Sequence, residues 1–231
     1  MFIYKKAYLR ICGAHFDLSQ FDDQQRHISN YSVQKDADLV LSSDDFIAFL
    51  RRTNPDKYKD LTWEGHFLPQ VDFAAKAALL QSADVIDNRP NSFELFGFDF
   101  VVDKDLKLWL IEVNMSPACS ERQPWLKEML DDMADGVTNM IAAKVQAHRS
   151  AQEHVARRAG LAATDGSQQI TSELHGKQSL YNKLQKQMLA RAIEGTQWAP
   201  MSKVDSFFLN SDSKSVKVKV PQSQVVHSVN P

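Results

Sequence analysis

The chain has 231 residues, of which 43% are hydrophobic and 24% charged, enough apolar material for one substantial domain and too much for a wholly disordered chain. The 27 Lys and Arg residues nearly balance the 29 Asp and Glu residues, and the net charge of -2 argues against a nucleic-acid-binding protein. No apolar run reaches the roughly 18 residues that a membrane span needs. The two cysteines, Cys12 and Cys119, are too few for a disulfide framework. We therefore expect a cytoplasmic protein that binds neither nucleic acid nor membrane.

Charge divides the sequence into two parts. Residues 1–150 hold 17 basic and 23 acidic side chains, whereas residues 151–231 hold 10 and 6, and aromatic residues become rare after residue 126. This shift predicts a compact domain over residues 1–148, followed by a basic, partly helical or disordered tail over residues 149–231.

Three segments in the first part of the chain have the pattern of regular structure. Alternating side chains over residues 7–12 predict a short strand. The polar run Ser42–Asp45 precedes apolar residues and predicts the start of a helix. Pro69 suits the first turn of a second helix, because apolar residues at helical spacing follow it as far as Leu79.

Two apolar runs, residues 93–102 and 107–114, flank the polar sequence of residues 103–106 and predict a β-hairpin. The runs favour a sheet covered on both faces, with Trp109 in its core. The polar sequence lacks the ligand spacing and the glycine of a calcium-binding loop, so we interpret it as an ordinary turn.

Polar residues interrupt these apolar runs at three positions, Asp99, Glu112 and Asn114. Glu112 and Asn114 lie two apart and share one face of their strand. A loop of even length, such as residues 103–106, pairs odd positions with even ones and places Asp99 on that face. A hard divalent cation would relieve the repulsion between the carboxylates, and Mg²⁺ typically takes one or two of them. The alternative is a solvated strand edge, or an ion pair between Glu112 and a distant arginine.

Two amphipathic patterns follow the hairpin. Residues 121–147 predict a long helix. Residues 177–194 predict another, with Lys183, Lys186 and Arg191 outside its apolar face. This second helix is packed on the folded domain, is a marginally stable helix in solvent, or is a basic element that contacts an acidic microtubule surface. From residue 200 onward the composition predicts disorder or a weak edge strand.

The run SFELFGFDFVVDKDLKLWLIEVNMSPAC, residues 92–119, closely resembles the final segment of the tubulin tyrosine ligase-like family, ATP-grasp ligases that add amino acids to tubulin. YKKAYLRIC at residues 4–12 and HISNYSVQK at residues 27–35 are similar to two further family segments, in the expected order. The resemblance implies the C-terminal part of an ATP-grasp fold, of class α+β, with a mainly antiparallel sheet flanked by helices.

The resemblance also implies roles for particular residues. In this family the Asp of a G-x-D-F motif and the Glu and Asn of an E-V-N motif hold the magnesium ions of ATP, and the matching residues are Asp99, Glu112 and Asn114. Arg10, in the Y-L-R motif, would lie beside the phosphates and the acceptor carboxylate. Asn30, preceded by Ser29 where the family usually has Thr, would border the same site.

The implied reaction uses ATP and Mg²⁺. A carboxylate of the protein substrate is phosphorylated, and the amine of a free amino acid attacks the resulting acyl phosphate. Glycine is slightly favoured as that amino acid, with glutamate and tyrosine as alternatives. The expected partner is tubulin or the microtubule, which implies a place in the cytoskeleton and in a cilium or flagellum.

Several parts of the family's pattern have no match in this sequence. They are the N-terminal domain, the lysines that bind the ATP phosphates and the adenine pocket, and no glycine-rich phosphate loop replaces them. We therefore expect a C-terminal portion of a ligase that binds ATP weakly and is a poor catalyst alone. The alternatives are a catalytically inactive microtubule-binding module derived from such a ligase and an ATP-grasp ligase with a small-molecule substrate.

Overall fold

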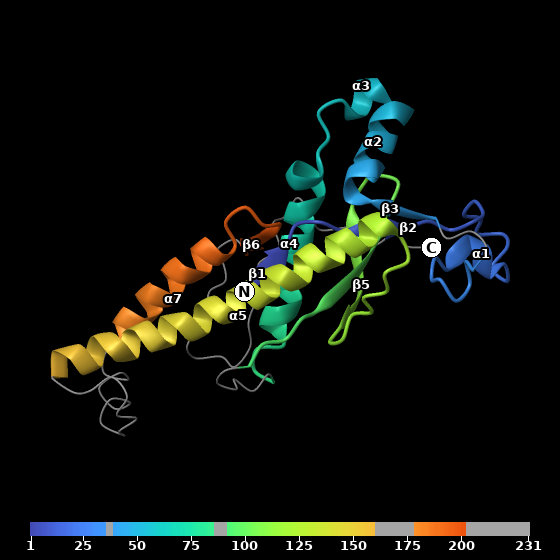
Figure 1. Ribbon diagram of the computed structural model, residues 1–231. Helices are drawn as coiled ribbons and strands as arrows, with labels where there is room; N and C mark the ends of the chain where they lie inside the picture. Colours follow the sequence, from blue (N-terminus) through green and yellow to red (C-terminus); the bar gives the residue numbers. More distant parts are fainter. Residues whose placement is uncertain (36–38, 86–91, 160–177, 202–231) are drawn as a thin grey trace, which may run out of the picture. The chain divides into compact units, whose positions relative to one another are not determined.

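The computed structural model describes residues 1–35, 39–85, 92–159 and 178–201, and it has a mixed α+β fold (Figure 1). The predicted class is confirmed, but the described strands form three separate two-stranded sheets instead of one larger sheet. The chain divides into two compact units. One consists mainly of Asp44–Ala118, and the other consists of Phe2–Ser43 together with Cys119–Ala199.

The Asp44–Ala118 unit contains a group of helices and one hairpin. The helical elements are α2 (Ser43–Thr53), α3 (Pro55–Tyr58), η1 (Trp63–Phe67) and α4 (Leu68–Gln81). Helices α2 and α4 confirm the two predicted helices. The π-helical turn η1 continues directly into α4. The predicted hairpin is also confirmed, with shorter strands that pair antiparallel, β4 (Gly97–Val102) and β5 (Leu108–Asn114).

Aromatic rings form the core of this unit. Phe67 is fully buried, and its ring centroid lies 5.2 Å from that of Trp63 and 5.6 Å from that of Phe46. The Thr62 hydroxyl accepts a hydrogen bond from the Gly65 N–H at 3.0 Å and caps the π-helical turn that carries two of these rings. The start of α4 is therefore fixed by packing as well as by its own helical hydrogen bonds.

Helix α4 holds the hairpin at its turn. The Gln70 side chain donates to the Leu106 carbonyl at 3.2 Å and accepts from the Leu108 N–H at 2.9 Å. His66 Nε2 lies 3.1 Å from the same Leu106 carbonyl. Leu106 has a φ of 60°, a left-handed conformation that is costly for leucine, and its side chain is buried. Burial and the hydrogen bonds from α4 compensate for this backbone strain.

The second unit is built around one long helix. Its strands and helices, in chain order, are β1 (Phe2–Tyr4), β2 (Tyr8–Arg10), α1 (Gln24–His27), β3 (Val40–Ser42), α5 (Pro124–Ala159), α7 (Gln178–Ala192) and β6 (Trp198–Pro200). Strand β2 lies within the predicted segment and pairs antiparallel with β3. Helix α5 is longer than predicted and runs without a break past residue 148. The domain boundary at residues 148 and 149 stays a prediction based on composition.

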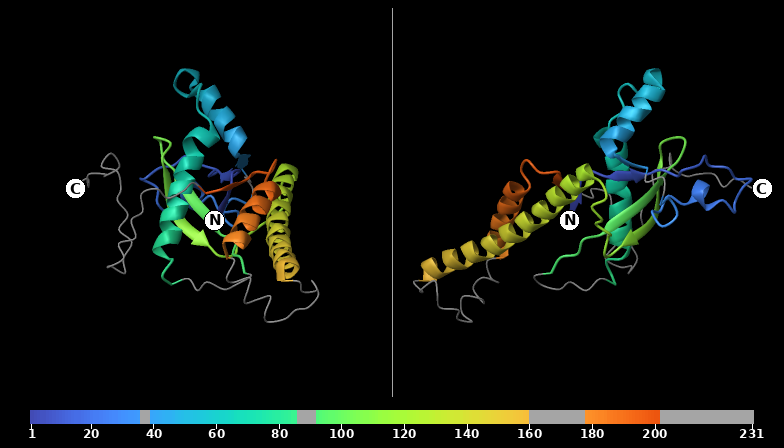
Figure 2. Two further views of the ribbon diagram at one scale, coloured as in Figure 1. Left: turned by 90° about the vertical axis from the view of Figure 1, so that its left-hand side faces the viewer. Right: turned by 45° about the vertical axis from the view of Figure 1, so that its right-hand side comes forward.

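Helix α7 lies beside the C-terminal half of α5, as both views in Figure 2 show. Ala151, Val155 and Ala156 of α5 are buried, and Tyr181 and Leu184 of α7 pack against them. The small side chains allow the two helices to approach closely. The structure therefore shows the packed alternative for this helix, and a contact with microtubules stays a prediction.

Strands β1 and β6 pair with each other, and hydrogen bonds from Tyr4 and Trp198 link them to α5. The Trp198 indole N–H donates to the Met133 carbonyl at 3.1 Å, and its ring lies against Gly136, where a Cβ atom would clash. The ring centroids of Trp198 and Tyr4 are 5.3 Å apart. Disorder or a weak edge strand was predicted from residue 200 onward; Pro200 is the last residue of β6, and the residues from 202 onward lie outside the described part of the chain.

None of the helices in the described part of the chain is both long and apolar enough to cross a membrane.

Candidate functional site

The three polar residues of the hairpin share one of its faces. Asp99 on β4 lies directly opposite Glu112 on β5, and Gly97 lies opposite Asn114. The Asn114 amide nitrogen donates to Asp99 Oδ2 at 2.8 Å and to Glu112 Oε1 at 3.1 Å. The strand register and these hydrogen bonds confirm the convergence that the sequence predicts.

The turn between the strands is one residue longer than the predicted loop. Residues 103–107 separate Val102 from its partner Leu108, so even positions pair with even positions near the turn. If this register continued, Asp99 and Glu112 would lie on opposite faces of the hairpin.

A β-bulge shifts the register and brings the carboxylates together. Phe100 pairs with Leu110, but the next pair along the strands is Asp99 with Glu112, so Ile111 has no partner on β4. A bulge inserts one extra residue into one strand in this way and often redirects side chains at functional sites. The predicted explanation by loop length is therefore wrong, and the bulge is the cause of the convergence.

The carboxylates lie on an open face of the hairpin. Asp99 and Glu112 are exposed and Asn114 is half-buried, while the neighbouring Val101 and Ile111 are 51% and 61% exposed. Within the described residues, the expectation of a sheet covered on both faces is therefore wrong. Exposed carboxylates do not need a cation to compensate for burial. The case for a cation depends on their convergence alone.

The donor set fits a magnesium ion that also binds phosphate. Two carboxylates and one carboxamide supply the hard oxygen donors that Mg²⁺ prefers. The Asn114 carboxamide directs its nitrogen toward the two carboxylates. A 180° flip of this amide group would direct its oxygen toward them instead. In the part of the chain that the structure describes, no three His, Cys, Asp or Glu side chains form a metal site. Asp99 and Glu112 would therefore need further oxygen ligands, such as phosphate.

Trp109 is not the core residue that its apolar strand predicts. Its side chain is 47% exposed, its indole N–H donates to Asp103 Oδ2 at 2.8 Å, and Lys107 Nζ lies 3.9 Å from the ring centroid. The Asp103 carboxylate also accepts from the backbone N–H groups of Lys107 and Asp105. The hydrogen bond from Trp109, followed by these backbone bonds, lowers the pKa of Asp103 because each donor favours the charged form. Asp103 thus closes the turn and orients Trp109.

The other predicted site residues lie in the second compact unit. Arg10 is the last residue of β2 and is half-buried, and Ser29 and Asn30 follow α1. Arg10 and Ser29 line one small hollow. Asn30 is exposed and is not among the residues that line it; its carbonyl accepts hydrogen bonds from the N–H groups of Val33 and Gln34.

A buried glutamine fixes the loop that carries Ser29. Gln34 is 4% exposed, and its amide nitrogen donates to the carbonyls of Gln25 and Ile28, both at 2.9 Å. Its side-chain oxygen accepts from the Gly13 N–H at 3.0 Å. Because one side chain joins three backbone positions, we assign Gln34 a positioning role for the loop after α1.

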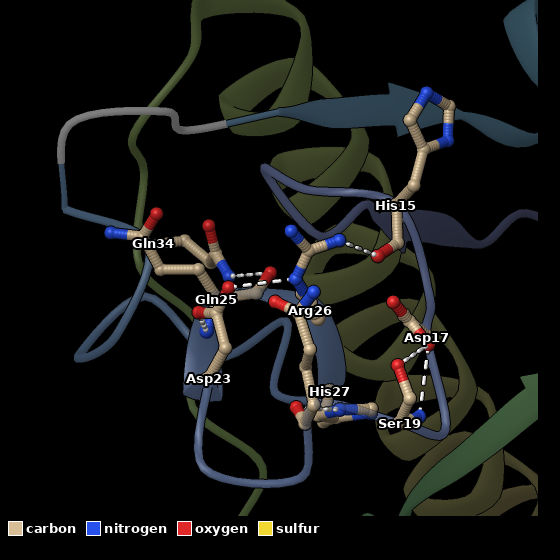
Figure 3. A network of polar contacts seen from close by, with 9 residues as sticks. His15, Asp17, Ser19, Asp23, Gln25, Arg26, His27 and Gln34 are labelled. Carbon is tan, nitrogen blue, oxygen red and sulfur yellow. Dashed lines mark hydrogen bonds and ion pairs between the residues drawn. The ribbon is translucent and has the colours of Figure 1, made fainter.

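Figure 3 shows the other polar contacts around this loop. Asp23 caps α1 by accepting from the Gln25 N–H at 3.2 Å, and it forms a salt bridge with Arg26 at 2.8 Å. Arg26 also donates to the His15 carbonyl at 2.8 Å. Partly exposed ion pairs of this kind contribute little stability. Gln34, which is buried, is therefore the more important contact.

Sequence reasoning did not identify Tyr31, Gln34 and Arg122, which line the same hollow as Arg10. Tyr31 and Gln34 lie inside the HISNYSVQK segment, so the motif already pointed to their position. Arg122 lies in an irregular segment just before α5 and belongs to no motif. Only the fold reveals that it lies near Arg10.

The sequence matches the model of the tubulin-tyrosine ligase family over residues 1–152. This chain belongs to the tubulin-tyrosine ligase family.

Curated relatives agree with this assignment. The chain is 36% identical over 141 residues to tubulin glycylase 3E of Tetrahymena thermophila, covering 58% of this chain and 10% of that protein. It is 31% identical over 136 residues to protein monoglycylase TTLL8 of Homo sapiens, covering 54% and 15%. It is also 32% identical over 120 residues to the probable tubulin polyglutamylase TTLL9 of Mus musculus, covering 50% and 26%. The matched region thus spans between a tenth and about a quarter of these relatives.

Proposed function

We propose that this chain holds the magnesium and phosphate end of ATP in a ligase that joins an amino acid to a tubulin carboxylate. The observation that supports the proposal is the convergence of Asp99, Glu112 and Asn114 on an open face of a hairpin, in a member of this family. The fold would be the C-terminal part of an ATP-grasp domain. Glycine is the favoured amino acid, because relatives named tubulin glycylase and protein monoglycylase match the chain.

The proposed reaction has two steps. A glutamate carboxylate of tubulin accepts the γ-phosphoryl group of ATP, which gives an acyl phosphate and ADP. The amino group of glycine then attacks the acyl carbon, an amide bond forms, and phosphate leaves as the amine loses a proton. When bound, Mg²⁺ neutralises the charge that develops on the phosphate oxygens.

The residues of this chain would bind and orient the charged groups. Asp99 and Glu112 are exposed and can reach an ion shared with phosphate, and Asn114 can supply an amide oxygen beside them. Arg10 would bind a phosphate or carboxylate oxygen, since its planar guanidinium can donate two parallel hydrogen bonds. Ser29 would contribute a polar group to the hollow that Arg10 lines, and Asn30, the next residue of the same loop, would border the site.

Binding of Mn²⁺ in the presence of ATP tests the metal site, because Mn²⁺ replaces Mg²⁺ and is visible by electron paramagnetic resonance. We expect Asp99→Asn and Glu112→Gln each to weaken Mn²⁺ binding by about tenfold or more, since each removes a charged ligand. The matched control is Glu64→Gln, because Glu64 is an exposed carboxylate in η1 of the same unit. Unchanged Mn²⁺ binding in both site variants would overturn the proposal.

Incorporation of labelled amino acids into tubulin tests the reaction. The protein should incorporate glycine in preference to glutamate or tyrosine, and Glu112→Gln should abolish incorporation. A chain that binds microtubules but neither Mn²⁺ nor ATP would instead indicate the inactive binding module.

A further inference from the structure

Two arginines from distant parts of the sequence line the hollow in the second unit. Arg10 comes from β2, and Arg122 comes from the segment just before α5. Tyr31 and Ser29 also line this hollow, and they come from the loop that Gln34 fixes. All of these residues belong to one compact unit.

Each guanidinium is oriented by an aromatic side chain. Arg122 Cζ lies 3.8 Å from the centroid of the Tyr31 ring, a close cation–π contact. Arg10 Cζ lies 5.5 Å from the Tyr8 ring centroid, and its Nη2 is 3.4 Å from the Tyr8 hydroxyl oxygen. A planar guanidinium stacked on a ring keeps its N–H donors directed outward at the edge of the stack.

Neither arginine has an acidic partner in the described part of the chain. The salt bridges there involve other basic residues, and Glu121, the sequence neighbour of Arg122, pairs with Lys127 at 3.7 Å. Two positive groups that share a hollow without a counter-charge repel each other. An anion bound between them would relieve this repulsion.

The geometry points to a carboxylate as this anion. A carboxylate is planar and matches the fork of a guanidinium through two parallel hydrogen bonds. Beside Gln34, the remaining wall of the hollow is formed by three apolar residues, Ile11, Leu39 and Val40, which suit the methylene groups that carry a carboxylate. A site for a polyphosphate would be expected to include backbone N–H groups at a glycine-rich loop, and none of the residues that line this hollow is a glycine.

We infer that Arg122, stacked on Tyr31, acts with Arg10 to bind the carboxylate of a substrate and so determines the specificity of this site. The inference rests on the proposed ligase function, which requires both an acidic protein segment and a free amino acid. The carboxylate belongs either to a glutamate side chain of the acidic segment or to the free amino acid. In both cases the group that the two arginines recognise is a carboxylate.

Titrations with a six-residue glutamate peptide and with glycine distinguish the two sources. Arg122→Gln should weaken binding of the recognised ligand by about tenfold or more, because charge-assisted hydrogen bonds are lost. Arg122→Lys should also weaken it, because a lysine keeps the charge but lacks the planar fork. Tyr31→Leu should weaken it by removing the ring on which Arg122 stacks. The control is Arg149→Gln, because Arg149 is an exposed arginine on α5.

Loss of peptide binding in Arg122→Gln with normal glycine binding supports a glutamate side chain as the ligand, and the reverse supports the free amino acid. Equal binding of both ligands by Arg122→Gln and the parent protein would overturn the inference, as would an equal loss in Arg149→Gln. Mn²⁺ binding with ATP should stay unchanged in Arg122→Gln. If the inference about Arg122 is wrong, Asp99 and Glu112 can still bind Mn²⁺. If the proposed function is wrong, Glu112→Gln will bind Mn²⁺ as well as the parent protein does.

Discussion

Asp99 and Glu112 lie opposite each other across the β4–β5 hairpin because Ile111 has no partner on β4. The register set by the turn would pair Asp99 with Ile111 and direct the Glu112 side chain to the other face. One unpaired residue therefore determines whether the two carboxylates meet. The bulge contributes more to the candidate metal site than the residue composition of the two strands does.

An alanine inserted between Asp99 and Phe100 should destroy the site. The inserted residue would give Ile111 a partner, and the alternation of the strands would turn both carboxylates to the half-buried face that Phe100 occupies. Burial of a charged carboxylate costs several kcal/mol unless a cation or a sufficient set of hydrogen bonds compensates for it. We expect a fall of about that size in the free energy of unfolding, measured with urea, together with loss of Mn²⁺ binding.

Deletion of Ile111 is the matched control for that insertion. It removes the bulge but joins Leu110 directly to Glu112, so Asp99 and Glu112 remain paired on the same face. We expect Mn²⁺ to bind this variant about as well as it binds the parent protein. If the deletion abolished binding while the insertion preserved it, Mn²⁺ binding would not depend on the open face of the hairpin on which the bulge places the two carboxylates.

Gly97 controls the distance between the strand that carries Asp99 and the segment after Asn114. A Cβ atom at Gly97 would lie only 2.8 Å from Pro117 Cβ. Gly97→Ala should therefore displace Pro117 and weaken folding by about 1–3 kcal/mol, as overpacking does. Because Gly97 pairs with Asn114, Mn²⁺ binding should weaken as well.

A double-mutant cycle separates this clash from other effects. Pro117→Gly removes the atoms that the new methyl group would contact, so Gly97→Ala should cost less in that background. The free energy of unfolding of the four proteins gives the coupling. An equal cost of Gly97→Ala in both backgrounds would show that the close approach to Pro117 is not the reason for glycine at this position.

The hairpin also shows how far the sequence alone can be interpreted. Apolar runs and turn residues predicted both strands, and the convergence of the polar residues was predicted from a loop of even length that the structure does not have. The bulge could not be predicted, because Ile111 lies in an apolar run and resembles its neighbours. The left-handed Leu106 depends on hydrogen bonds from Gln70, which is distant in the sequence. Local patterns contain no information about such contacts.

Two other residues show the same limit. Trp109 was predicted in the core because its neighbours are apolar, but its indole N–H finds an acceptor in Asp103 on an exposed face. Arg122 belongs to no periodic pattern, and its proximity to Tyr31 depends on how α5 and the loop after α1 fold together. The family motif predicted Arg10, whereas the second arginine required the structure.

Replacement of Gln34 should destabilise the unit that contains Arg10. Gln34→Ala leaves the Gly13 N–H and the carbonyls of Gln25 and Ile28 without the partner that the side chain supplies. We expect a loss of about 2–3 kcal/mol in the free energy of unfolding, because buried polar groups without partners are costly. The control is Gln25→Ala, since Gln25 is exposed and contributes its backbone carbonyl, which alanine retains. Equal effects of the two substitutions would contradict the positioning role.

Tyr4 makes the stability of the second unit depend on pH in the alkaline range. Its hydroxyl oxygen lies 2.7 Å from Asp132 Oδ2 and 2.9 Å from the Met129 carbonyl oxygen, and its one proton can be donated to either acceptor. Burial, then the hydrogen bond to Asp132 and the negative charge of that carboxylate, raise the pKa of Tyr4 above its ordinary value of 10.0. Because the folded state holds this proton more tightly than the unfolded state, the stabilisation is fully present below about pH 10 and is lost as the pH rises toward the folded pKa.

The free energy of unfolding of the parent protein should therefore fall more steeply between about pH 9.5 and 11 than that of Tyr4→Phe, which has no phenol proton to lose at this position. Urea unfolding at a series of pH values measures the two slopes. Tyr58→Phe, which removes a hydroxyl in the other unit, should keep the steep slope of the parent protein. Parallel slopes for Tyr4→Phe and the parent would mean that Asp132 does not hold the Tyr4 proton in the folded state.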